Sequence, residues 1–290
     1  MNNTKIAVIF TDKKEAIDYY QLNNGILQSL NLLGKNFDIE VFALTSEMNT
    51  IIRPRYEISF RNTYKALDFA INKRFEPDVV ILVGSTNFPY ERILNDKYKK
   101  KILIHKGNFY NKKVEGYFDH IIVETAEEEK EYKNSISASV VNTRIFRPQQ
   151  TEKYFSVCYP QQISDNRIDF FENIRFYGSI SQHLNSTVKL PFHSSEILST
   201  IMNQSKAVSI IEDIDSVELA LSALACNTPV IVTNDTKASK LPAVIKANAT
   251  TPDFINETYK ALELRYNFFE EYIKPNYTPE RFAKLLMELI

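Results

Sequence analysis

Four acidic residues stand close together after an apolar run and could contact a charged ligand. They are Glu212, Asp213, Asp215 and Glu218. The apolar run AVSII at 207–211 predicts a buried strand, and SVELALSALACN at 216–227 predicts a helix that starts at Val217 with Ser216 as its N-cap. In open α/β sheets, ligands bind beyond the carboxyl ends of strands, where helix N-termini offer N–H groups and a positive dipole end. The segment therefore predicts a strand, a ligand-facing loop and a helix suited to a diphosphate.

The rest of the chain alternates short β-branched runs with longer amphipathic runs. Strands are predicted at 5–10, 37–44, 77–84, 101–107, 119–124, 138–143, 154–160, 175–179, 188–192, 207–211 and 228–233. Helices are predicted at 23–34, 63–75, 165–174, 194–204, 216–227, 254–273 and 278–290, the last beginning with a Thr-Pro-Glu start signal. This alternation is typical of the α/β class, with parallel sheets covered by helices on both faces.

A polar stretch that contains proline, 147–153, has no periodicity and separates the two series of elements. We therefore expect two Rossmann-like domains with a cleft between them. The first spans residues 1–147 and holds the acceptor, and the second spans 148–290 and binds the nucleotide sugar.

Composition argues against a disordered chain, a generally polyanion-binding protein and a membrane-spanning protein. The chain has 290 residues, of which 44% are hydrophobic, so a large core is expected. Its 35 Lys and Arg nearly balance 36 Asp and Glu, which leaves no global field to attract a polyanion. No apolar run reaches the roughly 18 residues of a membrane helix, and the prediction is a cytoplasmic protein. Cys158 and Cys226 suit neither a disulfide framework nor a metal site, and buried thiols are expected.

Two stretches resemble the GT-B glycosyltransferases, specifically the large retaining family that includes sucrose synthase. VVNTRIFRP at 140–148 is similar to the segment that ends that family's N-terminal domain. LSALACNTPVIVTND at 221–235 is similar to the family's L-E-A-M-A-C-G-T-P-V-I-A-S. The resemblance implies the GT-B architecture and transfer of a sugar, with retention, from a nucleotide-diphosphate sugar. It also implies no cofactor and no bound metal.

The chain departs from the family at the two glutamates that contact the sugar and the ribose. Ile214 and Ser222 stand at those positions. Glu218 precedes Ser222 by one helical turn, so we expect Glu218 to replace the ribose acid and Glu212 to replace the sugar-facing acid. Alternatively, the acids here are solvated groups favoured by the helix dipole.

The resemblance also implies cationic groups for the diphosphate near the start of the second domain. Gln162 stands where the family has an arginine, and Arg167 stands close to the family's lysine. Arg167 can bind a phosphate with two hydrogen bonds, whereas Gln162 donates only a neutral one. Gly178 is assigned to the same donor site. The alternative for Arg167 is an ordinary surface arginine.

Two residues of the first domain complete the predicted catalytic region. His105 ends the run KILIH and could contact the donor sugar or the reaction centre, although a lone strand-end histidine is more often structural. Gly25 in YYQLNNGILQSL is interpreted as a remnant of the family's glycine-rich loop beside the donor phosphates. Asn24 and Gly25 could instead form a simple turn.

Seven lysines occur between residues 97 and 113 together with aromatic residues and without an acid. They are Lys97, Lys99, Lys100, Lys101, Lys106, Lys112 and Lys113. Lys106, Lys112 and Lys113 are predicted to bind an anionic acceptor: a lipid-linked sugar phosphate, an acidic glycan or modified DNA. Peripheral association with a membrane would fit the same cluster. The alternative is a solvated lysine-rich loop.

The sequence thus predicts a glycosyltransferase with a nucleotide sugar and a glycan, lipid-linked or other hydroxyl acceptor, acting in polysaccharide biosynthesis. A catalytically degenerate GT-B subunit that binds a partner and a phage-type DNA base glycosyltransferase are the alternatives. An epimerase of the same architecture would need a fuller set of acids and histidines. The D-I-D triplet at 213–215 matches a metal-binding signature of the other nucleotide-sugar transferase fold. That fold carries the signature in its first domain, whereas here the triplet follows a second series of strands and helices, so this interpretation is not favoured.

Overall fold

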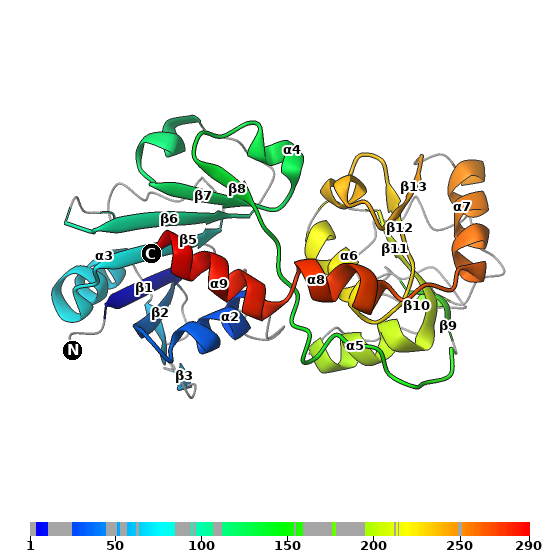
Figure 1. Ribbon diagram of the computed structural model, residues 1–290, viewed down its shortest axis with the longest axis horizontal. Helices are drawn as coiled ribbons and strands as arrows, with labels where there is room; N and C mark the ends of the chain where they lie inside the picture. The colour runs from blue at the N-terminus through cyan, green and yellow to red at the C-terminus, as the bar shows by residue number, and fades with distance from the viewer. Residues whose placement is uncertain are drawn as a thin grey trace. The chain divides into compact units, whose positions relative to one another are not determined.

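The structure, a computed structural model, describes residues 4–10, 25–44, 51–52, 57–61, 64–84, 94, 97–106, 112–153, 155–158, 176–177, 195–211, 213, 215–248 and 251–290. The chain divides into two compact units (Figure 1). Unit 1 comprises Met1–Ser139 and Pro279–Ile290, and unit 2 comprises Val140–Thr278. Each unit has a parallel sheet of its own with helices packed against it.

Unit 1 is built on a sheet with the strand order β3-β4-β2-β1-β5-β6-β7-β8. All neighbours pair in parallel except β3 and β4. The strands are β1 (Lys5–Phe10), β2 (Asp38–Leu44), β3 (Ile51–Ile52), β4 (Glu57–Arg61), β5 (Val79–Gly84), β6 (Lys100–His105), β7 (His120–Val123) and β8 (Ser135–Ser137). From β1 the chain adds β2, β4 and β3 on one side and β5 to β8 on the other, so the order reverses between β1 and β5. This arrangement is the doubly wound one.

Both faces of the unit 1 sheet are buried, as the continuous apolar runs predict. Ala7, Val80 and Leu103 belong to one buried cluster, which also includes Leu67 of helix α3 (Tyr64–Phe69) and Ile71 of the π-helical continuation η1 (Ala70–Phe75). The intervening strand residues are buried as well. Because side chains alternate between the two faces of a strand, this burial needs a second covering layer.

The C-terminal helix of the chain belongs to unit 1. Helix α9 (Pro279–Leu289) packs along α2 (Gly25–Leu33), as Figure 1 shows in red and blue. Its buried positions Phe282, Ala283, Leu286 and Leu289 recur at helical spacing. The apolar stripe of α9 is thereby removed from water.

Unit 2 has a sheet with the strand order β10-β9-β11-β12-β13, paired in parallel throughout. The strands are β9 (Phe155–Cys158), β10 (Phe176–Tyr177), β11 (Ser205–Ile210), β12 (Val230–Thr233) and β13 (Ile245–Ala247). The described helices are α5 (Ser195–Gln204), α6 (Ser216–Ala225), η5 (Lys237–Lys240), α7 (Thr251–Glu263), η6 (Phe269–Ile273) and α8 (Lys274–Asn276). Here the strand order reverses between β9 and β11.

The core of unit 2 lies between its sheet and the neighbouring helices α5 and α6. It contains Val208 of β11, Val232 of β12 and Leu221 of α6, all fully buried. Helix α7 packs across β11, β12 and β13. The small residues of the LSALA run allow α6 to approach the sheet closely.

The division into units differs from the predicted boundary after residue 147 in two places. Residues 140–147 belong to unit 2, because Val141 and Phe146 lie in its core and the Val141 N–H donates to the Tyr277 carbonyl 2.9 Å away. The terminal helix 279–290 belongs to unit 1 because its apolar face is buried there.

Two predicted elements are wrong, and several short ones were not predicted. Residues 138–143 form no strand; they are the extended crossing between the units. The predicted helix 254–273 is broken at 264–267, between α7 and η6. Strands β3, β4, β8 and β13 were not predicted, since short strands carry little periodicity. Among the helices that the structure describes, none is long and apolar enough to cross a membrane.

Candidate functional site

The carboxyl edge of the unit 2 sheet is where its topology places a ligand. The order of strands reverses between β9 and β11, and ligands of doubly wound folds bind outside the carboxyl ends of strands at such a switch point. Beyond β11 the chain passes through Ile211, Asp213 and Asp215 into the N-terminus of α6. The predicted strand and helix are therefore confirmed. They meet at the carboxyl edge of the sheet, beside its switch point.

Asp213 holds this edge together. Its Oδ1 accepts a hydrogen bond from the Lys237 N–H at 2.5 Å and another from the Ser216 hydroxyl at 3.2 Å, and its carbonyl accepts from the Ser216 N–H at 3.2 Å. The Ser216 hydroxyl in turn accepts from the Ala238 N–H at 3.2 Å. Asp213 thus ties the loop after β11 to the start of α6 and to the loop after β12.

The loop after β12 carries its own hydrogen bonds from hydroxyl groups. The Thr236 hydroxyl donates to the Thr233 carbonyl at 2.8 Å, and the Ser239 hydroxyl donates to the Thr236 carbonyl at 2.7 Å. The Thr233 hydroxyl reaches the Ile211 carbonyl at 3.4 Å, back across the sheet edge. All three hydroxyl residues are buried. A loop held in this way positions its neighbours with little freedom.

Helix α6 starts one residue earlier than predicted. It begins at Ser216, and its N-cap is Asp215, whose φ of 54° is left-handed and whose side chain makes no capping hydrogen bond. Aspartate is one of the few residues other than glycine that adopts this conformation. Ser216 is therefore the first helical residue and not the N-cap. Its hydroxyl bonds Asp213 and Ala238 inside the fold.

Glu218 is the acidic residue in the first turn of α6 and is half-buried, whereas Val217 beside it is buried. Ser222, at the family's ribose position, is only 2% exposed and lies in the helix interior. A helix rises about 1.5 Å per residue, so Glu218 is roughly 6 Å nearer the helix start than Ser222. Of these two residues, only Glu218 has exposed surface at the ligand end.

Several predicted donor-site residues lie outside the described residues. They are Gln162, Arg167, Gly178 and Glu212.

In unit 1, Gly25, Gly84 and His105 lie at the carboxyl edge of the sheet. Gly25 is the buried first residue of α2, and its carbonyl accepts from the Ser29 hydroxyl at 2.8 Å. Gly84 ends β5, next to the switch point between β1 and β5, and has a φ of 137°. Side chains other than hydrogen rarely allow that backbone conformation. Gly84 was not among the predicted site residues. A glycine directly after VVILV, in a chain with only 6 glycines, nevertheless indicates a backbone position that needs glycine.

His105 pairs with Gly84 across β5 and β6 but is not open to a ligand. Its side chain is 2% exposed and packs against Tyr132, with ring centroids 5.6 Å apart. Its Nε2 lies 3.5 Å from the Tyr132 hydroxyl. This burial favours the structural interpretation of His105.

The predicted acceptor lysines do not lie together. Lys106 follows β6 at the carboxyl edge, where its ammonium lies 2.6 Å from the Glu124 carboxylate, which follows β7. Lys112 and Lys113 are exposed in the 3₁₀ helix η3 (Lys112–Gly116), which leads toward the amino end of β7. β6 has six residues, so the amino edge of the sheet lies roughly 20 Å from the carboxyl edge where Lys106 stands. Glu124 was not among the predicted site residues, although the sequence shows this acid directly after the run DHIIV.

Both cysteines are buried and free, as expected. Burial raises the pKa of Cys226 to about 12, and burial also raises the pKa of Cys158. Among the residues that the structure describes, no three His, Cys, Asp or Glu side chains form a group suited to a metal ion. Metal independence stays a prediction.

Comparison with solved structures finds the same architecture along the whole chain. A UDP-GlcNAc 2-epimerase from Methanocaldococcus jannaschii has a TM-score of 0.62 at 13% identity, with 98% of this chain and 100% of that chain covered. HepE from Anabaena, in complex with UDP-glucose, has a TM-score of 0.66 at 8% identity, with coverages of 99% and 100%. The chain has the GT-B fold.

A third similar structure is the UDP-GlcNAc 2-epimerase from Neisseria meningitidis bound to UDP-GlcNAc. Its TM-score is 0.60 at 14% identity, with 98% of this chain and 99% of that chain covered. Compared by sequence, the chain matches no protein-family model and no curated protein. The α/β class and two-domain GT-B architecture are therefore confirmed at the level of the fold.

Proposed function

We propose that this GT-B protein binds a nucleotide-diphosphate sugar at the carboxyl edge of the unit 2 sheet and transfers the sugar to a hydroxyl acceptor. One observation carries the proposal. At the switch point of that sheet, Asp213 bonds the loop after β12 to the start of α6, and Glu218 stands in the first turn of that helix. The edge is thus preorganised and carries a half-exposed acid.

The geometry suggests a role for each group. The N-terminus of α6 offers N–H groups and the positive end of its dipole to the diphosphate, where charge accumulates as the glycosidic bond breaks. Glu218 would accept hydrogen bonds from the ribose hydroxyls. Arg167, Gln162, Gly178 and Glu212 remain predicted contacts to the diphosphate and the sugar.

The ligands of similar structures support the choice of nucleotide sugar. HepE was solved with UDP-glucose, and the Neisseria epimerase was solved with UDP-GlcNAc. The proposed acceptor is a glycan or lipid-linked hydroxyl compound, with polysaccharide biosynthesis in the cytoplasm as the setting. Because Lys106 pairs with Glu124, an anionic acceptor would have to compete with that carboxylate or bind Lys112 and Lys113. Retention of configuration rests on the family resemblance alone.

Epimerisation is the second candidate, because several of the similar structures are UDP-GlcNAc 2-epimerases. An epimerase would use the same donor site but needs acid and base groups beside the sugar. In the described part of unit 1, His105 is buried and Glu124 is paired with Lys106, which favours transfer. A subunit that binds the nucleotide sugar without reaction is the third candidate.

One experiment on the full chain separates the three candidates. Thermal unfolding with a panel of nucleotides and nucleotide sugars identifies the ligand, since a ligand at 100 times its dissociation constant adds about 2.7 kcal/mol to stability. The stabilising sugar nucleotide is then incubated with the protein alone. Slow release of free sugar and nucleotide indicates a transferase, a changed sugar on an intact nucleotide indicates an epimerase, and no change indicates a binding subunit. If no compound of the panel stabilises the chain, the proposed function is wrong.

A further inference from the structure

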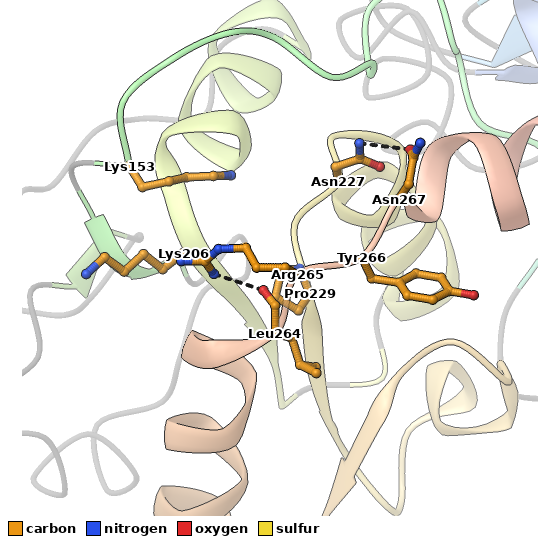
Figure 2. A pocket seen from close by; sticks show the side chains of 8 residues that line it. All are labelled: Lys153, Lys206, Asn227, Pro229, Leu264, Arg265, Tyr266 and Asn267. Atoms are coloured by element: carbon orange, nitrogen blue, oxygen red, sulfur yellow. Dashed lines mark hydrogen bonds between the residues drawn. The ribbon is translucent and has the colours of Figure 1, made fainter.

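Unit 2 contains a pocket that none of the predicted nucleotide-site residues lines; Figure 2 shows its lining side chains. Its volume is about 480 Å³, within the range of small-molecule sites. Its lining residues come from four places in the chain and include three cations and no acid. They are Lys153, Lys206, Asn227, Pro229, Leu264, Arg265, Tyr266 and Asn267.

This pocket is at the amino edge of the sheet. Lys153 precedes β9, Lys206 is the second residue of β11 and Pro229 directly precedes β12, while Asn227 follows the end of α6. The proposed nucleotide site is at the opposite end of the same elements. Helix α6 has ten residues, so its two ends lie roughly 15 Å apart. The two sites are therefore separate within one unit.

Two cations of the pocket, Lys153 and Arg265, donate hydrogen bonds to neutral oxygens. The Lys153 ammonium donates to the hydroxyl of the fully buried Thr228 at 3.1 Å. Nη1 of Arg265 donates to the carbonyls of Leu262 and Leu264, at 3.4 and 2.9 Å, where α7 ends. Both of these bonds use Nη1, and the rest of the guanidinium fork remains available to a ligand. Within the described part of the chain, Lys153, Lys206 and Arg265 make no ion pair.

The charge of Arg265 acts on Lys153. Burial of the ammonium lowers the pKa of Lys153, Cys226 opposes that shift, and the positive charge of Arg265 adds to it. Like charges held together without an acid destabilise one another, and an anion between them reverses the sign of that interaction. Figure 2 shows the Lys153 ammonium and the Arg265 guanidinium in the left half of the view, with the Lys206 side chain extending away from the guanidinium.

The neighbouring hollow does not share this chemistry. It has a volume of about 540 Å³ and is lined by Arg147 but also by Glu270, whose carboxylate pairs with Lys274 at 2.8 Å. Asn227 and Asn267 line both hollows, and their side-chain amides are joined by a hydrogen bond of 3.2 Å. The all-cationic wall is on the Lys153 side of that amide pair.

We infer that the pocket formed by Lys153, Lys206 and Arg265 binds the phosphate dianion of a small phosphorylated molecule. Arginine presents a planar fork that matches two phosphate oxygens, and the lysines of the pocket add positive charge. Asn227 and Asn267 supply neutral polar groups at the rim, and Leu264 and Tyr266 supply apolar surface for the remainder of the ligand. The inference does not depend on the proposed sugar transfer.

The test is calorimetric titration of the full chain with inorganic phosphate and, separately, with glycerol phosphate, at constant ionic strength. Saturable binding of phosphate is expected, with chloride giving none. Tighter binding of the monoester indicates that the apolar surface contacts an organic group, whereas equal binding indicates a site for free phosphate. Lys206→Gln and Arg265→Gln are each expected to weaken binding roughly tenfold, because each removes a charge-assisted hydrogen bond.

Lys246→Gln is the matched control, because Lys246 is an exposed strand lysine of the same unit outside this pocket. It should bind phosphate as the wild type does. Arg265 also contacts the end of α7, so Arg265→Gln is expected to lower stability as well; Lys206 is exposed, and Lys206→Gln is expected to keep the fold. If phosphate fails to bind saturably, or if Lys206→Gln binds it as tightly as Lys246→Gln does, the inference is wrong. The result is independent of nucleotide binding at α6, which Glu218→Gln reports.

Discussion

The carboxylate of Asp213 accepts a hydrogen bond from the Lys237 N–H, 2.5 Å away, and so joins the loops that follow β11 and β12. These strands are neighbours in the sheet of unit 2, and their loops form its carboxyl edge. The same carboxylate reaches Ser216 at the start of α6. One side chain therefore positions the helix end and the loop that would surround a diphosphate.

Replacing Asp213 should loosen this edge. We expect Asp213→Ala to lower the free energy of unfolding by about 1–3 kcal/mol, because it leaves donors of Lys237 and Ser216 without their acceptor. Nucleotide binding should weaken in the same variant. Asp213→Asn, which keeps an acceptor oxygen, serves as control and should retain more of the stability. Chemical denaturation measures the stability of the wild type and of both variants. Equal stability of all three proteins would contradict this role.

Glu218 should contribute to nucleotide binding rather than to stability. We expect Glu218→Gln to weaken binding of the stabilising nucleotide roughly tenfold through loss of charge-assisted hydrogen bonds to the ribose. Glu196→Gln is the matched control, since Glu196 is an exposed acid in the first turn of α5. Calorimetric titration compares them. Undiminished affinity in Glu218→Gln would show that the ribose binds elsewhere.

Asp78 should make unit 1 sensitive to acid. The ion pair with Lys99, at 2.7 Å, and the hydrogen bond from the Lys5 N–H lower the pKa of Asp78 below its ordinary 3.8. A carboxyl with a lowered pKa in the folded state adds stability that is complete above the unfolded-state pKa and is lost as the pH falls through the folded-state pKa.

Asp78→Asn should therefore unfold at a lower temperature than the wild type near neutral pH. The difference should shrink as the pH falls below 3.8. Asp235→Asn, an exposed turn residue of unit 2, should show no such trend. Thermal unfolding across a pH series is the measurement, and a difference that is constant down to the lowest pH would refute the assignment.

The two thiols should be inert in the folded protein. Burial raises the pKa of Cys226 to about 12 and also raises the pKa of Cys158, so both remain protonated and covered at mildly alkaline pH. A thiol-specific reagent should label neither cysteine until denaturant is added, and labelling should then follow unfolding. Rapid labelling of the native protein would mean that the core of unit 2 opens locally.

The last helix should stabilise unit 1. Leu286 is fully buried in α9, and Leu286→Ala should cost about 2–5 kcal/mol of unfolding free energy, as for other large-to-small core changes. Met287, which is 43% exposed on the same helix, provides the control, and Met287→Ala should cost less than about 1 kcal/mol. Similar losses in both variants would contradict the packing of α9 on the first unit.

Periodicity and strand-end acids were enough to predict the strands β1, β5, β11 and β12 and the helix that carries Glu218. These features are local, because continuous apolar runs need a parallel sheet with two covered faces and the Ala-rich run needs a helix. The break at 264–267 and the short strands β3 and β4 were missed. β3 is too short to show a periodicity, and β4 joins the sheet by pairing with β2.

The sequence by itself determined an α/β chain of two units with parallel sheets and predicted a ligand-facing loop within the segment 209–235, since those features follow from local hydrophobic patterns. Only the tertiary structure decided which of the candidate groups are buried, paired or brought together. It buried His105 under Tyr132, paired Lys106 with Glu124, and brought Lys153, Lys206 and Arg265 together from segments up to 112 positions apart. Such contacts depend on the register of strands and on packing between distant elements, which no local pattern encodes.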